Sequence, residues 1–379
     1  MRHKFGDIVF AITEKRKPTE ADMETYIGLE HLDAGDLLIV RYGSKVPISG
    51  EKLVMKKGDL LFGRRNTYLK RAAIAPHDGL FSAHGMIFRP KAEVVDPTFL
   101  PFFIASDYFF DSAIRISVGS ISPTVNWNTL RELKFDVPPI AKQRRLAEVL
   151  WAAVHAREAY KRLLDLTEQA VKSGFVEMFG DPVTNNKGWP VKPLKEFSLV
   201  KIGPFGSLLH ADDYVENGTP LINPSHIVDG QVVADSQLTL TQEKFAALSA
   251  YALKTGDVVL GRRGEIGRCA VVNSGEYICG TGSMFIRIKR NYLPMILQWI
   301  LSSDRMRSVL EKMAVGITML NLNANMVANL DMIMPPLDLQ HRFAELVRVA
   351  DKSKFAVEKQ VDLVSQFETG VIGGLSHVQ

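Results

Sequence analysis

The sequence predicts an α+β protein: two repeated mixed α/β domains joined by two long helices that pack together as an antiparallel coiled coil. Three observations support this prediction. One segment recurs about 200 residues later, each copy ends at a double proline, and a long proline-free amphipathic stretch follows each double proline. A period of this length indicates two copies of one domain-plus-helix unit, because solenoid repeats are only about 20 to 50 residues long.

The repeat is clearest in a strand-and-turn segment. Residues 254–263 (KTGDVVLGRR) reproduce residues 56–65 (KKGDLLFGRR) at an offset of 198. Continued without a gap to Lys289, this offset pairs Ala72 with Ala270 and gives ten identities in 36 positions, enough to assign one fold to both segments. Short apolar runs between Gly, Pro and Asp residues in each copy predict short strands and turns.

Each copy then predicts helices. The first strand is expected at 5–10, and helical stretches follow the strands at 97–114 and 293–312. A double proline precedes each long helix, since proline is tolerated at a helix start but not inside one. The predicted boundaries are 1–137 for the first domain, 138–180 for a central spacer helix, 181–334 for the second domain and 335–379 for a C-terminal spacer helix.

The two long helices each carry an apolar stripe with residues mostly three and four apart. We expect the stripes to be buried against each other, antiparallel if the units are related by a pseudo-twofold axis; the alternative is that each helix packs on its own domain. The candidate residues for this seam, or for docking of a partner, are Leu146, Val149, Tyr160, Leu163, Phe343, Leu346, Val357 and Val361.

Composition excludes several classes of protein. The two cysteines, Cys269 and Cys279, are too few for a disulfide framework or a four-thiolate zinc site. No stretch has 18 uninterrupted apolar residues, and the N-terminus lacks the apolar region of a signal peptide, so a reduced, cytoplasmic protein without a membrane span is predicted. The net charge of +4 excludes a polybasic protein but leaves room for a local basic surface.

A search for catalytic motifs finds no P-loop, no His-Glu-x-x-His and no Gly-x-Ser-x-Gly, so neither catalytic nor metal-binding residues are predicted. His31 and His226 occupy equivalent places in the repeat and are interpreted as packed or hydrogen-bonded residues. One enzymatic alternative stays open: a metal-dependent DNA nuclease acting alone through Asp111 and Glu132.

The repeated Gly-Arg-Arg sequence predicts a nucleic-acid contact. In both copies a strand ends in glycine and two arginines, which could bind phosphates or guanine edges. The alternative is a solvated loop whose arginines pair with acidic residues such as Asp59 and Asp257. The candidate DNA-binding residues of these turns are Arg64, Arg65, Lys70, Arg71, Arg262, Arg263 and Arg268.

A second shared loop follows the helical stretch, at 118–124 in the first copy and 315–320 in the second. Its small and hydroxyl residues could either donate to phosphate or form a turn. Arg115, Ser120 and Thr318 are its candidate DNA contacts.

The combination of these features resembles the specificity subunits of type I restriction-modification systems. The residues that carry the resemblance are the Pro-Pro-x-x-x-Gln-x-Arg motifs of 138–145 and 335–342, the Gly-Asp-(apolar)₃-Gly-Arg turns, and Gly188-Trp189-Pro190-Val191 at the start of the second unit. The resemblance covers essentially the whole chain.

The resemblance implies a non-catalytic subunit in which each domain reads one half of a bipartite double-stranded DNA target. It implies that the helices dock two methyltransferase subunits, and that a restriction subunit joins the assembly. S-adenosylmethionine, ATP and Mg²⁺ are expected only in those partner subunits, with no cofactor in this chain. A helix-mediated scaffold that binds no nucleic acid is a further alternative, and it predicts binding that is insensitive to salt.

Overall fold

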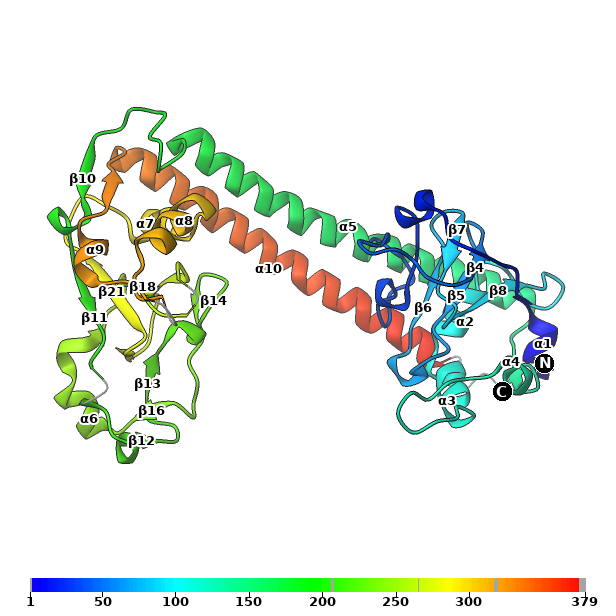
Figure 1. Cartoon of the computed structure of the whole chain (residues 1–379). Helices are drawn as coiled ribbons and strands as arrows, with labels where there is room; N and C mark the ends of the chain where they lie inside the picture. The colour runs from blue at the N-terminus through cyan, green and yellow to red at the C-terminus, as the bar shows by residue number, and fades with distance from the viewer. Residues whose placement is uncertain (1, 206–207, 265, 317–319, 375–379) are drawn as a thin grey trace. The chain divides into compact units, whose positions relative to one another are not determined.

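The computed structural model describes residues 2–205, 208–264, 266–316 and 320–374. The chain divides into two compact units, unit 1 with Met1–Leu164 and Ala356–Gln379, and unit 2 with Asp165–Phe355. The fold is α+β, and two long helices, α5 (Ile140–Phe179) and α10 (Leu337–Gly373), each contribute one part to each unit (Figure 1). These helices lie inside the spans predicted for the two spacer segments.

Unit 1 contains short strands followed by helices. Its helices before α5 are α1 (Phe5–Ile8), α2 (Leu100–Ala105), α3 (Asp107–Arg115) and α4 (Trp127–Leu130). Its strands are β1 (Arg2–Lys4), β2 (Val9–Ile12), β3 (Lys15–Arg16), β4 (Lys52–Met55), β5 (Leu60–Phe62), β6 (Ala72–Ile74), β7 (Gly79–Phe81), β8 (Met86–Pro90) and β9 (Lys134–Asp136).

Unit 2 repeats this order with additions. Its helices between α5 and α10 are α6 (Gln242–Ala247), α7 (Pro294–Ser302), α8 (Asp304–Met313) and α9 (Ala324–Ala328). Its strands are β10 (Val191–Pro193), β11 (Ser198–Ile202), β12 (Tyr214–Val215), β13 (Thr219–Ile222), β14 (Ile227–Val228), β15 (Gln231–Val232), β16 (Thr239–Leu240), β17 (Ala252–Leu253), β18 (Val258–Gly261), β19 (Cys269–Val271), β20 (Tyr277–Cys279), β21 (Ser283–Ile288) and β22 (Asp331–Ile333).

The repeat seen in the sequence is also a repeat of topology. The main sheet has the strand order β2-β8-β5-β6 in unit 1 and β11-β21-β18-β19 in unit 2, and every neighbouring pair is antiparallel. A serine N-cap begins the second helix of each pair, where Ser106 Oγ accepts from Phe109 N and Ser303 Oγ accepts from Met306 N. The helical stretches predicted at 97–114 and 293–312 are therefore two short helices each.

The strand predicted at 5–10 is wrong over its first four residues. Phe5–Ile8 forms one helical turn, with β1 before it and β2 after it, because β1 pairs with β9 while β2 pairs with β8 in another sheet. The turn lets the chain change sheets and buries Phe5 among Phe88, Phe109 and Phe135.

The gapless alignment of Ala72 with Ala270 is also wrong. In the sheets, Leu61 pairs with Ala73 and the equivalent Val259 pairs with Ala270. The turn after Gly63 (64–70) is thus one residue longer than the turn after Gly261 (262–267). Both turns close with the same hydrogen bond, from Gly63 N to Arg71 O and from Gly261 N to Arg268 O, so Arg71 is the counterpart of Arg268.

The glutamine of each Pro-Pro-x-x-x-Gln motif ties the start of a long helix to its domain. Gln143 is fully buried, donates to Pro138 O at 2.7 Å and accepts from Asp96 N at 2.7 Å. Gln340 is equally buried, donates to Pro335 O at 2.8 Å and accepts from Leu293 N at 2.8 Å. The motif is therefore a structural joint, and its side chain satisfies backbone groups that would otherwise be buried without partners.

Replacing Gln340 by alanine should lower the free energy of unfolding by about 2 kcal/mol, because the buried carbonyl of Pro335 and the partly buried N–H of Leu293 lose their partner together. Urea unfolding followed by circular dichroism measures this loss. His341→Ala is the control, since His341 is the adjacent exposed residue of the same helix and should change stability little. Equal effects of the two substitutions would contradict the joint.

Within each unit the two long helices lie side by side and antiparallel. In unit 1, Leu150 and Val154 of α5 pack with Val371 and Ile372 near the end of α10. In unit 2, Phe175 of α5 contacts Phe343 near the start of α10, with ring centroids 5.3 Å apart. Parts of both helices also join the domain cores, so the two packing alternatives occur together.

In unit 1 the structure buries only part of the candidate seam residues, and the exposed ones remain candidates for docking. Leu146, Tyr160 and Val361 are half-buried, but Val149 and Leu163 are 49% and 44% exposed, while Leu150 is fully buried. The buried face of α5 is displaced because this helix packs on Phe102 of the domain as well as on α10. Val357 and Phe343 are buried as predicted, and Leu346 is half-buried.

Leu346 lies over Gly174, where an added Cβ would come within 2.8 Å of the leucine Cδ2. The absent side chain of Gly174 thus lets the two helices approach closely in unit 2.

A buried ion pair interrupts the apolar seam in unit 1, which the stripe does not predict. The Arg157 guanidinium donates to the Glu368 carboxylate, and both residues are less than a tenth exposed. Burial raises the pKa of Glu368, and the positive charge of Arg157 opposes that rise. Asp36 of the domain lies 3.4 Å from Arg157 and 3.2 Å from Lys161, and so links the domain to α5.

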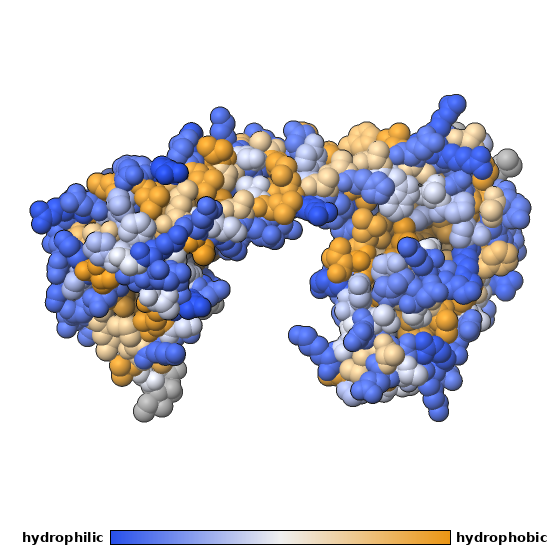
Figure 2. Space-filling view, turned by 90° about the horizontal axis from the view of Figure 1, so that it is seen from above, coloured by the Kyte–Doolittle hydropathy of each residue, from blue (hydrophilic) through white to orange (hydrophobic). Residues whose placement is uncertain are grey.

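The surface of the long helices remains partly apolar. Figure 2 shows apolar side chains interspersed with charged ones along these helices. Among the described residues, no helix combines the length and the apolar character that crossing a bilayer would require.

Candidate nucleic-acid interface

The Gly-Arg-Arg turn and the second shared loop, which are apart in the sequence, lie together in unit 1. Val125 N donates to Arg64 O at 3.0 Å, and Asn66 N donates to Pro123 O at 2.7 Å. The Arg65 side chain donates to Ser122 Oγ at 3.2 Å. The turn 63–71 and the loop 118–125 thus form one surface, which we call the two-loop element of unit 1.

Unit 2 contains the equivalent element, whose described residues are 261–264, 266–268, 315–316 and 320–322. Leu322 N donates to Arg262 O at 2.9 Å, and Arg263 forms a β-bridge with Asn321, as Arg65 does with Thr124 in unit 1. Thr318, a predicted DNA contact, lies outside the described residues.

Positive φ angles shape both turns. Asn66 and Lys70 have φ of 54° and 47°, and the corresponding Gly264 and Gly267 have 72° and 89°. Glycine adopts this conformation freely and asparagine tolerates it. The two turns therefore fold alike although one is longer.

The two arginines of each turn have different environments. Arg65 and Arg263 are exposed, while Arg64 is half-buried and Arg262 is only 6% exposed. Arg262 donates from Nε to Leu322 O at 3.1 Å and from Nη1 to Thr281 O at 3.2 Å. Burial, followed by the neighbouring positive charge of Arg263, lowers the pKa of Arg262. Arg262 therefore holds the two loops together, which does not fit its prediction as a DNA contact.

The other predicted cations also have defined positions. Lys70 forms ion pairs with Asp107 and Asp111 of α3, so part of its charge is neutralised. Arg115 is exposed and donates to Asp111 O at 3.2 Å, and Ser120 is exposed near the tip of the second loop. Arg71 and Arg268 are half-buried, and Arg268 donates to Ile227 O at 3.3 Å.

The alternative in which Asp59 and Asp257 neutralise the arginines of the turns is not supported. Each aspartate is buried at the opposite end of its strand from the turn. Each accepts two hydrogen bonds from an arginine of the neighbouring strand in the sheet, β8 or β21. Arg89 donates to Asp59 at 2.6 and 2.9 Å, and Arg287 donates to Asp257 at 2.8 and 2.7 Å. The exposed Arg65 and Arg263 thus keep their positive charge toward solvent.

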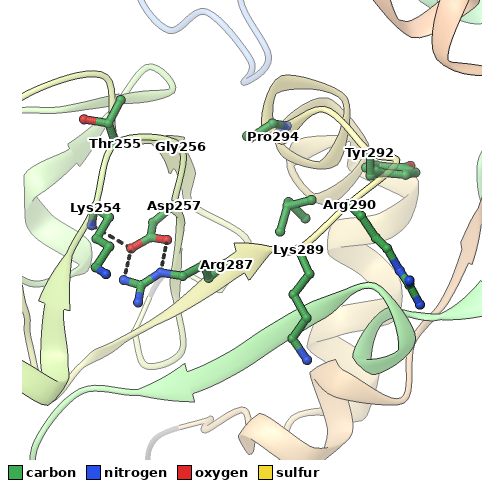
Figure 3. A pocket seen from close by; sticks show the side chains of 10 residues that line it. Lys254, Thr255, Gly256, Asp257, Arg287, Lys289, Arg290, Tyr292 and Pro294 are labelled. Atoms are coloured by element: carbon green, nitrogen blue, oxygen red, sulfur yellow. Dashed lines mark hydrogen bonds and ion pairs between the residues drawn. The ribbon is translucent and has the colours of Figure 1, made fainter.

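A shallow pocket of about 430 Å³ lies beside the Asp257–Arg287 pair in unit 2 (Figure 3). Lys254, Lys289 and Arg290 also line it, and in Figure 3 the last two side chains extend away from the pair. The pocket adjoins the start of β18, whereas the Gly-Arg-Arg turn follows the end of that strand. It is therefore separate from the two-loop element.

The carboxylates of the nuclease alternative have separate partners. Asp111 pairs with Lys70, and Glu132 pairs with Lys4 at 2.7 Å. Glu132 lines a pocket of about 320 Å³ whose lining residues do not include Asp111. Across the described part of the chain, no three His, Cys, Asp or Glu residues are grouped closely enough to hold a metal ion.

The histidines and cysteines have structural roles. His31 and His226 each accept at Nδ1 from the N-cap residue of a 3₁₀ helix, from Gly28 N at 3.0 Å and Asn223 N at 3.1 Å, which confirms the hydrogen-bonded interpretation. Cys269 and Cys279 are buried free thiols whose pKa values burial raises.

Comparison with known proteins identifies relatives of the whole chain. A family described as the type I restriction modification DNA specificity domain matches residues 186–363. The specificity subunit of the type I restriction enzyme MjaVIII from Methanocaldococcus jannaschii is 20% identical, over 94% of this chain and 88% of that protein. The MjaIX specificity subunit of the same organism is 23% identical, over 79% of this chain and 69% of that protein.

Two solved structures share the fold. One comes from a study of complex assembly and conformational transition of the type I R-M system, with a TM-score of 0.62 and 19% identity over 99% of this chain and 97% of that chain. The other is the type I S subunit from M. genitalium, with a TM-score of 0.60 and 10% identity over 99% and 95%. Residues 186–363 thus match the type I DNA specificity domain, and almost the whole chain is similar in sequence and fold to specificity subunits of type I restriction-modification systems.

Proposed function

We propose that each unit reads one half of a bipartite double-stranded DNA target through its two-loop element. The observation that carries this proposal is the recurrence of an exposed arginine, Arg65 in unit 1 and Arg263 in unit 2, at the same place of the same hydrogen-bonded pair of loops. A guanidinium at such a position can bind a phosphate, or can donate to O6 and N7 of a guanine in the major groove.

The long helices are proposed to space the two half-sites and to dock the methyltransferase subunits. Helix α5 has 40 residues, so it is about 60 Å long, enough for one to two turns of DNA at about 34 to 36 Å per turn. Exposed apolar residues on both helices support a docking role, because a partner subunit can remove this apolar surface from water. They include Val149, Leu166, Val176, Val349, Leu363 and Phe367.

The repeat favours two methyltransferase subunits, one for each copy of the unit, with a restriction subunit joining them. S-adenosylmethionine, ATP and Mg²⁺ are assigned to these partners, where methyl transfer to a flipped base takes place. We place this assembly in the cytoplasm, where buried free thiols such as Cys269 and Cys279 stay reduced.

The test uses the full chain in complex with its methyltransferase subunits and a duplex carrying the methylated sequence that genome-wide mapping identifies. Arg65→Ala and Arg263→Ala should each weaken binding about tenfold to a hundredfold, the cost of one base or phosphate contact. Wild-type affinity should fall when either half-site is scrambled. The affinity of each variant should become insensitive to scrambling of one half-site only. This half-site should be a different one for Arg65→Ala and for Arg263→Ala.

Loss of sensitivity to the same half in both variants would contradict a bipartite reading. Affinity that does not fall as salt rises would favour the scaffold alternative over DNA recognition.

A further inference from the structure

The second loop of the unit 1 element presents an apolar side chain to solvent at its tip. Ile121 is 93% exposed, and its neighbours in the loop are Ser120 and Ser122. Val118, at the base of the same loop, is 68% exposed. Single exposed apolar residues need no explanation, but this one lies on the surface that also carries the exposed Arg65.

The loop is held at its base. Val118 N donates to Thr124 O and Thr124 N donates to Val118 O, both at 3.0 Å, and Gly119 allows the turn with a φ of 114°. The Arg65 guanidinium donates to Ser122 Oγ, the residue directly after Ile121. Ile121 is thus fixed next to a cation that favours polyanions, and an anionic partner that meets Arg65 also meets Ile121.

We propose that Ile121 is a specificity residue that packs on the C5-methyl group of a thymine in the major groove of the DNA bound by unit 1. The proposal rests on the function proposed above and names one base that it reads. In the major groove the thymine methyl is the one apolar group that base pairs of unmodified DNA present, and aliphatic or methyl-bearing side chains recognise it. The flanking serines can serve the polar base edges beside it.

A base-edge contact fits Ile121 better than insertion between base pairs. Unstacking a base step costs about as much free energy as the burial of one isoleucine side chain returns. Packing on a methyl group removes the same apolar surface from water without distorting the duplex. Arg65 beside the isoleucine further favours DNA over an apolar protein surface, since burying a guanidinium in such a surface is unfavourable.

The experiment uses the complex of the full chain with its methyltransferase subunits, and duplexes in which each thymine of the mapped target is replaced singly by deoxyuridine. Uracil lacks only the methyl group. Wild type should bind one of these duplexes about fourfold more weakly, the equivalent of one methyl group returned to water. Ile121→Ala should bind the thymine duplex about fourfold more weakly than wild type and show no further loss with uracil at that position.

Val40→Ala is the matched control, because Val40 is an exposed apolar residue of unit 1 outside the two-loop element, and its removal should keep the thymine preference. The proposal is overturned if Ile121→Ala keeps the full preference, if Val40→Ala abolishes it equally, or if no uracil substitution affects wild type. Equal weakening of all duplexes by Ile121→Ala would indicate insertion between bases. Loss of methyltransferase assembly with normal DNA discrimination would indicate a protein contact. Both results also overturn the proposal.

Arg65→Ala distinguishes a failure of this inference from a failure of the function on which it rests. If Arg65→Ala abolishes reading of one half-site while Ile121→Ala changes nothing, DNA recognition by the two-loop element stands and the thymine contact falls. If neither variant affects DNA binding, the proposed function itself falls.

Discussion

Replacing Asp257 by alanine should lower the free energy of unfolding of unit 2 by about 2 to 3 kcal/mol, among the largest effects expected of a single substitution outside the apolar core. Asp257 is 1% exposed, accepts two hydrogen bonds from Arg287 and also accepts from Lys254 N at 2.7 Å. Its removal leaves a guanidinium beside a buried strand start and opens the turn before β18. The partial exposure of Arg287, 29% of its side chain, keeps the cost below that of a fully buried pair.

The control for this prediction is Asp33→Ala. Asp33 also accepts two hydrogen bonds from one arginine, Arg41, at 2.6 and 2.8 Å, but both side chains are more than half exposed. Exposed ion pairs contribute little, so its loss should change stability by less than about 1 kcal/mol. Urea unfolding curves of the full chain provide the comparison. Equal destabilisation by the two substitutions would show that burial does not set the strength of these pairs.

The repeat explains why much of the fold is predictable from the sequence. A motif that occurs in both copies marks equivalent positions of the same fold. Gly-Asp, Gly-Arg-Arg and Pro-Pro-x-x-x-Gln each occur in this way. The structure explains two of these motifs physically. Asp59 and Asp257 bind an arginine of the neighbouring strand in the sheet, and Gln143 and Gln340 tie a long helix to its domain. A motif that occurs in both copies can thus have a structural role as readily as a role in contacting DNA.

The identity of the exposed arginine in each turn could not be predicted from the sequence. Arg64 and Arg65 are consecutive, and the direction of each depends on the loop 118–125 that packs against the turn from far along the chain. Periodicity fails in the same way at Val149, because the domain and the other helix together decide which face of α5 is buried. Long-range packing overrides local pattern at these positions.

We therefore expect substitution of Arg262 to affect mainly stability, and substitution of Arg263 to affect mainly DNA binding. Arg262→Ala should lower the free energy of unfolding by about 2 kcal/mol, because a buried charge-assisted hydrogen bond to Leu322 O and a partly buried one to Thr281 O are lost. Arg263→Ala should leave stability unchanged within about 0.5 kcal/mol, as is usual for exposed side chains, while it weakens DNA binding at least tenfold. Thermal unfolding of the full chain measures the change in stability. DNA titration of the methyltransferase complex, at a temperature below the unfolding range, measures the change in binding.

Arg290→Ala is the matched control for Arg263→Ala, since it removes the same charge from an exposed site beside the pocket at the other end of β18. If net charge alone governed affinity, both variants would lose DNA binding equally, and the gap in affinity between them therefore isolates the contact made at the turn. A stable Arg262→Ala variant that loses DNA binding as fully as Arg263→Ala would instead place Arg262 on the DNA. Its burial at 6% exposure would then have to be relieved on binding, by a movement of the loop that Leu322 anchors.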